Sequence, residues 1–229
     1  MDVRTPPAQT HGRYLVDSPG DHAAGIICGF HGYKENAEQH LDALRRVAAA
    51  RPASPKPGEG GAWRLVSVQA LNRFYSKGGE VVANWMTKQD RDLAIADNVA
   101  YVSSVMSEVA DEYGAAHPLI YAGFSQGVAM AYRAAAFAGR PCDGLIVLAG
   151  DLPPDVAPVA AQLPPILLGR GTADEWYTAE KASNDLVLLN ASGATVAEHV
   201  FDGGHEWHEA FVARAGAFLD ERSRPTPSR

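Results

Sequence analysis

Segment 123–127 reads Gly-Phe-Ser-Gln-Gly, a serine framed by glycines two residues away on each side. The apolar run Leu119–Ala122 precedes it, and a run rich in alanine, valine and methionine follows. A G-x-S-x-G sequence between a strand and a helix is typical of a nucleophile elbow, a sharp turn that exposes a serine hydroxyl at the top of a sheet. Ser125 is therefore the candidate nucleophile, and the chemistry it could perform is attack on a carbonyl carbon.

A serine hydroxyl needs a base to take its proton, and a carboxylate to orient that base. In chains with such an elbow, the acid and then the histidine follow the serine. Three histidines follow Ser125: His199, His205 and His208. His205 comes after two glycines in a loop beyond the last expected strand, and we predict it to be the base. His208, expected inside the next helix, is the alternate, and His199 is interpreted as structural.

The candidate acid lies in the loop after the expected strand Ile166–Gly169. Asp174 occupies this loop, between the nucleophile and the base in chain order, and we predict it to be the third catalytic residue. Glu175 is its main competitor, while Asp151 and Asp155 follow the preceding strand. A loop aspartate can also simply cap a helix, so the prediction depends on the position of the loop at the carboxyl end of a strand.

The oxyanion formed by such an attack needs preorganised backbone N–H donors. One comes from the residue after the nucleophile, which is Gln126, and the other from an early strand-to-helix loop. The loop His31-Gly32-Tyr33 follows an apolar run, so the Tyr33 N–H is the second candidate donor, and Gly32 would permit close approach of the backbone. His31 is interpreted as a loop histidine that hydrogen-bonds its own turn.

Short apolar runs alternate with helical patterns along the chain. The expected strands are Arg13–Val16, Ala24–Phe30, Trp63–Ala70, Leu119–Ala122, Gly144–Ala149, Ile166–Gly169 and Thr195–Phe201. The expected helices are Ala37–Ala50, Gln89–Tyr113, Gln126–Ala138, Ala179–Asn190 and Trp207–Glu221. This order predicts an α/β fold with a mostly parallel central sheet and helices on both faces. Ligands of such sheets bind beyond the carboxyl ends of the strands.

Length and charge restrict the class of protein. We expect residues 1–229 to form one domain, with an ordered core of about 13–221, a surface loop at Arg51–Gly61 and a flexible tail at 222–229. The 20 basic and 27 acidic residues leave a net charge of −7, which argues against nucleic acid or an anionic membrane as a partner. No signal peptide or membrane-spanning run is evident, so a cytoplasmic location is expected. Cys28 and Cys142 are expected to be reduced.

The sequence resembles the phospholipase/carboxylesterase family of small α/β-hydrolases, which includes acyl-protein thioesterase-like enzymes. The resemblance rests on segments 30–33, 35–37, 123–127, 171–174 and 203–206, and extends over about residues 24 to 219. It implies an α/β-hydrolase fold without a large lid. It also implies a serine carboxylester hydrolase (class EC 3.1.1) that acts on short to medium carboxylic esters, thioesters or lysophospholipids and needs no metal or other cofactor.

Aromatic residues occur near the expected ends of the strands and are candidates for the substrate pocket: Tyr75, Trp85, Trp176 and Trp207. Trp176 and Trp207 flank the predicted acid and base. Trp85 resembles the family's tryptophan before its long helix. The partner is expected to be a small-molecule ester, and a homodimer through an exposed apolar rim is left open.

Other functions compete with this interpretation. A metal hydrolase would use the histidines and glutamates that lie close together in two segments, although neither has a recognised ligand spacing. These sets are His205, Glu206 and His208, and His31, Glu35 and His40. A hydrolase-fold protein can also be a non-catalytic binding protein. A triad hydrolase of a peptide, lactone or polyester keeps the same residues and changes only the substrate.

Overall fold

The computed structural model describes residues 1–20, 23–51, 61–115 and 118–223. Its main sheet has seven strands in the order β1-β3-β2-β6-β7-β8-β9. They are β1 (Arg13–Asp17), β2 (Ile26–Phe30), β3 (Arg64–Gln69), β6 (Leu119–Phe124), β7 (Gly144–Leu148), β8 (Ile166–Gly171) and β9 (Val196–Phe201). Strand β1 pairs antiparallel with β3, and the other neighbours are parallel. The predicted mostly parallel α/β sheet is confirmed.

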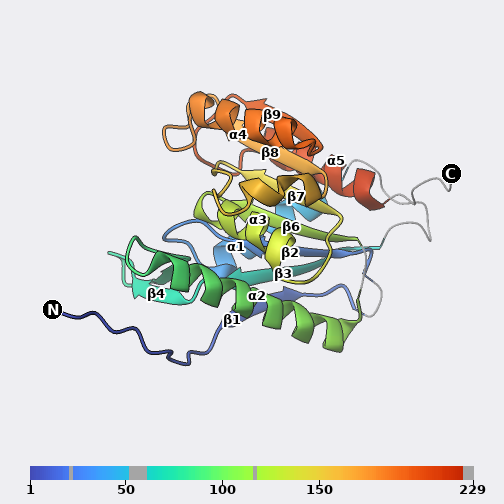
Figure 1. The fold of residues 1–229 in the computed structure, drawn as a ribbon. Coiled ribbons are helices and arrows are strands. Elements are labelled where there is room, and N and C mark those ends of the chain that lie inside the picture. The colour runs from blue at the N-terminus through green and yellow to red at the C-terminus, as the bar shows by residue number, and fades with distance from the viewer. Residues whose placement is uncertain (21–22, 52–60, 116–117, 224–229) are drawn as a thin grey trace.

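Five α-helices and one 3-10 helix accompany the sheet in the described residues. They are α1 (Ala37–Ala49), α2 (Arg91–Tyr113), α3 (Gln126–Phe137), η1 (Ala157–Gln162), α4 (Ala179–Ser192) and α5 (Glu209–Ser223). Figure 1 shows α2 and α3 in front of the sheet and α1 behind it, so both faces are covered. This explains why every residue of β2, β6 and β7 is buried and why these strands are nearly continuous apolar runs.

Some boundaries differ from those predicted. Helix α5 begins at Glu209, so His208 precedes the helix rather than lying inside it. The same helix continues to Ser223, past the predicted start of the flexible tail at residue 222, while 224–229 lie outside the described residues. The predicted surface loop falls mostly on residues 52–60, which also lie outside them. Both cysteines are free, as expected.

A two-stranded sheet of β4 (Asn72–Tyr75) and β5 (Val81–Asn84) was not predicted. Most of β4 is exposed, so its sequence lacks the alternation of apolar and polar residues that marks a half-buried strand. The amide and carbonyl of Ala83 in β5 bond Glu35 and Lys34, which follow β2. The small sheet therefore holds the loop that leads out of the main sheet toward α1.

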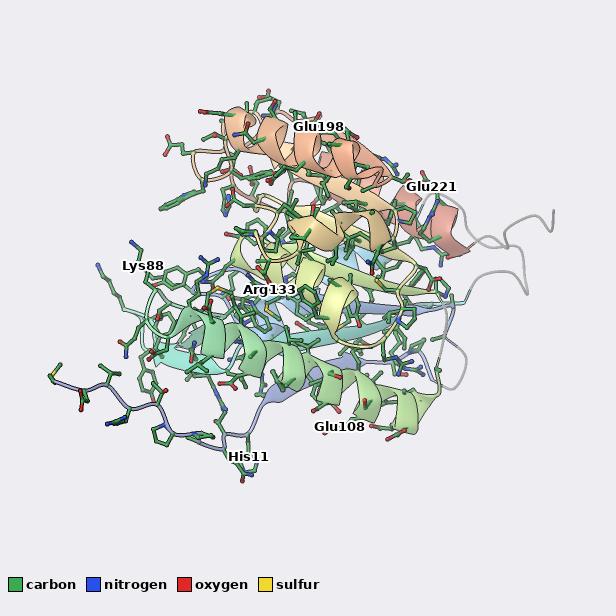
Figure 2. The ribbon with its side chains drawn as sticks, viewed as in Figure 1. His11, Lys88, Glu108, Arg133, Glu198 and Glu221 are labelled. Atoms are coloured by element: carbon green, nitrogen blue, oxygen red, sulfur yellow. The ribbon has the colours of Figure 1, made fainter. Side chains whose placement is uncertain are left out.

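Helix α3 is anchored by a charged side chain that lies inside the protein. Arg133 is fully buried, and its guanidinium donates two hydrogen bonds to the Asp155 carboxylate, at 2.8 and 2.7 Å. This bidentate pairing holds the pKa of Asp155 below its usual value. Figure 2 shows Arg133 in the middle of the molecule, with other labelled charged side chains at its edges: Lys88, Glu108, Glu198 and Glu221. The pair ties α3 to the segment after β7.

No helix in the described residues is long and apolar enough to cross a membrane.

Candidate active site

Ser125 lies at the junction of β6 and α3 with a backbone conformation of φ 53° and ψ −120°. A positive φ is uncommon for a residue other than glycine and costs about 1–3 kcal/mol, so the surrounding structure must impose it. The Ser125 amide donates to Leu148 in β7, at 2.9 Å. A side chain at Gly127 would overlap the backbone carbonyl of Phe30, and one at Gly123 would overlap the start of α3. The predicted strand, turn and helix are present, with the glycines where backbones approach closely.

The His205 ring and the Asp174 carboxylate are paired. Nδ1 of His205 lies 2.8 Å from Oδ2 of Asp174. The other carboxylate oxygen, Oδ1, accepts the amides of Trp176 and Tyr177, at 2.8 and 2.9 Å. The Asp174 side chain is fully buried, whereas the His205 side chain is 22% exposed. An ionised carboxylate only accepts hydrogen bonds, so Nδ1 carries the proton and Nε2 is left able to accept one.

The loops that carry these two residues lie side by side because β8 and β9 are parallel neighbours. The amides of Thr172 and Ala173 donate to the carbonyls of Phe201 and Gly203, at 2.8 and 2.9 Å. A side chain at Gly171 would overlap the backbone carbonyls of Gly203 and Gly204. The carboxyl ends of the two strands thus bring together side chains that are 31 positions apart in the sequence.

Three of the competing residues, Glu175, His208 and His199, do not form part of this pair. Glu175 is exposed, next to the buried Asp174. His208 stacks on Phe201, with ring centroids 5.1 Å apart, and its Nδ1 accepts the Ala210 amide. His199 lies within β9, against a phenylalanine of α5. In the part of the chain that the structure describes, no group of three or more histidine, cysteine, aspartate or glutamate side chains could hold a metal ion.

Ser125 and His205 both line a cleft of about 580 Å³. Its apolar lining includes Met86, Leu152, Pro153, Pro154 and Trp176, and its charged lining consists of Arg91, Asp151, Lys181 and Asp185. Of these, Asp185 is buried, and its carboxylate accepts the Leu152 amide and the Tyr177 hydroxyl, each at 2.9 Å. Burial raises the pKa of Asp185. The lining of the cleft therefore contains both apolar and charged side chains.

The four aromatic pocket candidates have different positions. Trp176 lines the cleft and is 74% exposed. Trp85 is fully buried and donates its indole N–H to the His31 carbonyl, at 2.8 Å. Trp207 packs on Phe124 and lies outside the cleft lining, and Tyr75 is exposed on β4. Of the four predicted aromatic residues, Trp176 is thus the one that lines the same cleft as Ser125.

The two predicted oxyanion donors are both available. Gln126 is the first residue of α3, so its amide has no acceptor within the helix. The Tyr33 amide has no hydrogen-bond partner among the residues described, whereas the Gly32 and Lys34 amides donate to Glu35 and Ala83. The Gln126 side chain also bonds the backbone of residues 85 and 86, at 2.9 and 3.1 Å. These bonds were not foreseen from the sequence, because they depend on the unpredicted small sheet.

Beneath the loop of Tyr33, His31 is buried and hydrogen-bonds the Gly32 carbonyl through Nδ1, at 2.7 Å, as predicted. Its Nε2 accepts the Ala70 amide, at 3.1 Å. Burial lowers the pKa of His31 to about 4 and that of His40, in α1, to about 3. Both rings are therefore neutral in the folded protein at neutral pH.

Because of these two histidines, we expect the free energy of unfolding to fall in acid. Between about pH 6.5 and pH 4, the unfolded chain binds protons at both rings and the folded protein does not, so the free energy of unfolding falls as the pH is lowered. One unit of pKa difference corresponds to about 1.4 kcal/mol. We expect the melting temperature to fall from pH 7.5 to pH 4.5, and to fall less steeply in His40→Gln. Equal pH dependence in the two proteins would contradict this assignment for His40.

The sequence matches no protein-family model and no curated protein. Solved structures do resemble the fold. Esterase PE8 is 22% identical with a TM-score of 0.69, over 92% of this chain and 98% of that one. A carboxylesterase from Mesorhizobium loti is 17% identical with a TM-score of 0.71, over 91% and 94%. Zea mays acyl-protein thioesterase 2 is 19% identical with a TM-score of 0.67, over 93% and 100%. The chain has the α/β-hydrolase fold, and the resemblance drawn from its motifs is confirmed at that level.

Proposed function

We propose that this protein is a serine hydrolase of carboxylic esters, of class EC 3.1.1, in which Ser125, His205 and Asp174 form the catalytic triad. The observation that carries the proposal is the bond between the buried Asp174 carboxylate and His205, in a cleft that Ser125 also lines. The strained backbone of Ser125 adds support, because strain of this kind is retained where the surrounding structure imposes it and is common at active sites. The similar structures include esterases and a thioesterase, which agrees with this chemistry.

In the proposed mechanism, the Ser125 hydroxyl attacks the ester carbonyl while Nε2 of His205 takes its proton. The C–O bond to the alcohol then breaks, and His205 returns the proton to the leaving oxygen. Asp174 stabilises the imidazolium that forms in between. The amides of Tyr33 and Gln126 bind the oxyanion. Water deacylates Ser125 by the same route, so ester and water yield acid and alcohol without a cofactor.

The cleft favours short to medium acyl groups. The charged lining residues Arg91, Asp151 and Lys181 would lose hydration beneath a long alkyl chain, which costs free energy. Lys181 already lies 3.5 Å from the Asp151 carboxylate, so this part of the lining is polar even where the charges are paired. An acyl group short enough to contact only apolar lining residues, such as Met86, Leu152 and Trp176, would avoid that cost.

Hydrolysis of a p-nitrophenyl ester series tests the proposal. We expect kcat/KM to be higher for the acetate and butyrate than for the laurate and palmitate, and to fall by at least about a thousandfold in Ser125→Ala. An optimum at palmitate would contradict the substrate size and favour a lysophospholipid or long-chain thioester. Absence of hydrolysis for the whole series, and for matching thioesters, would contradict the proposed reaction and favour a binding protein or a peptide, lactone or polyester substrate.

A further inference from the structure

A carboxyl group not used by the proposed triad lies in the oxyanion loop. Glu35 accepts the Gly32 amide through Oε2, at 2.6 Å, and its own amide donates back to the Gly32 carbonyl, at 3.3 Å. The main chain here is held independently by β5, because Lys34 donates to Ala83 at 3.1 Å and Ala83 donates to the Glu35 carbonyl at 2.8 Å. The side chain is therefore not needed to pin the backbone of Glu35 itself, and its carboxyl acts on Gly32.

The carboxyl group is close to the candidate nucleophile. A methyl group placed on Gly32 would lie 3.1 Å from Oε2 of Glu35, 3.1 Å from the Phe124 ring and 3.3 Å from Cβ of Ser125. The oxyanion loop, the elbow and the Glu35 carboxyl thus meet around one glycine. This proximity also means that a small rotation of the loop would move its amides relative to Ser125.

The bond to Glu35 decides which amide of the loop is available. With the Gly32 N–H engaged by the carboxyl and the Lys34 N–H by Ala83, the Tyr33 N–H between them is the one left without a partner in the described residues. Lys34 also adopts a positive φ of 65°, so the turn is a strained one that needs such restraints. Without the Glu35 carboxyl, the Gly32 amide would have to hydrogen-bond another acceptor. The peptide planes on either side of Gly32 would rotate as a result.

This position requires an oxygen that accepts the hydrogen bond of the Gly32 amide. A full negative charge on that oxygen would weaken the binding of the oxyanion. A carboxylate this close to the elbow would repel an oxyanion, because both charges are negative. Burial raises the pKa of the Glu35 carboxyl, which favours the neutral form. A neutral carboxyl retains its carbonyl oxygen as an acceptor for the Gly32 amide.

We infer that Glu35 is a positioning residue: it binds the Gly32 amide and so holds the oxyanion loop with the Tyr33 amide free to receive the oxyanion. The inference rests on the proposed ester hydrolysis at Ser125. It assigns to Glu35 an effect on the transition state rather than on substrate binding, because the oxyanion exists only after attack.

Two substitutions test the inference. Glu35→Gln keeps an acceptor oxygen in a side chain that cannot ionise, whereas Glu35→Ala removes the acceptor. We expect kcat for p-nitrophenyl butyrate to fall about 10- to 100-fold in Glu35→Ala, with KM within about threefold, because a displaced oxyanion donor weakens only the transition state. Glu35→Gln should retain kcat within about threefold. The inhibition constant of a trifluoromethyl ketone, whose serine adduct carries an oxyanion, should rise in Glu35→Ala in parallel with the loss of kcat.

A matched control is available at the opposite end of β6. There Asp143 accepts the Leu119 amide through its carboxylate, at 2.8 Å, which is the same type of bond away from the cleft. Asp143→Ala should lower the melting temperature and leave kcat unchanged. If Glu35→Ala does not fold, Glu35→Met replaces it, since methionine has similar length and only a weak acceptor.

The results separate this inference from the proposed function. Unchanged kcat in Glu35→Ala, or an equal loss in Glu35→Gln, would overturn the role assigned to the Glu35 oxygen while the esterase proposal stood. A rise in KM with constant kcat would also overturn it. A wild-type protein inactive on all esters would instead overturn the proposed function, and the inference about Glu35 with it.

Discussion

Ser125→Ala is expected to lower kcat/KM for p-nitrophenyl butyrate by at least about a thousandfold without a measurable loss of thermal stability. The substitution removes the oxygen that forms the acyl-enzyme and leaves the cleft and the oxyanion donors in place. The fold should not change, because two backbone hydrogen bonds hold Ser125. Its amide donates to the Leu148 carbonyl at 2.9 Å, and its carbonyl accepts the Val128 amide at 3.0 Å. At the positive φ of 53°, the backbone of alanine is strained to the same extent as that of serine.

Steady-state kinetics and thermal melts of the two proteins check this expectation. A labelling experiment with a fluorophosphonate adds a direct readout: the wild type should gain mass on the peptide that contains Ser125, and Ser125→Ala should not. Ser104→Ala is a suitable control, because Ser104 is an exposed serine whose hydroxyl donates to a carbonyl of its own helix. Equal hydrolysis by wild type and Ser125→Ala would remove Ser125 from the reaction.

Asp174→Asn is expected to lower kcat by about 10³- to 10⁴-fold, a loss similar to that in other serine triads. The reason lies in how the carboxylate is held. Oδ1 accepts the amides of Trp176 and Tyr177, so the amide oxygen of asparagine must take this place. Its NH₂ group then faces His205, where it donates to Nδ1. His205 must carry its proton on Nε2 and can no longer accept the proton of Ser125.

Glu175→Gln is the matched control, since Glu175 is adjacent, acidic and exposed. It should retain kcat within about twofold, and both variants should melt close to the wild type. The double variant Ser125→Ala/Asp174→Asn should be no less active than Ser125→Ala alone, because the two residues act in one step. An active Asp174→Asn together with an inactive Glu175→Gln would show that the acid had been assigned to the wrong neighbour.

The fold class and the approximate place of the site could be predicted because both depend on local pattern and chain order. Runs such as Leu119–Ala122 are apolar on both faces, which only strands covered on both faces require, and β6 is one of these. Parallel strands place their carboxyl ends at one edge, so Ser125, Asp174 and His205 could be expected together before any distance was known. The β4–β5 sheet was missed because exposed strands carry little pattern.

The sequence by itself determined the order of the strands and helices along the chain and the residue types at three strand ends, because hydrophobic periodicity and glycine spacing act over a few residues. Only the tertiary structure shows that Asp174 is buried and pairs with His205 while Glu175 is exposed, since this depends on which side chain the turn directs toward His205. It also placed Trp176 in the cleft and Trp85 in the core. Such choices depend on contacts between segments far apart in the chain, which no local pattern encodes.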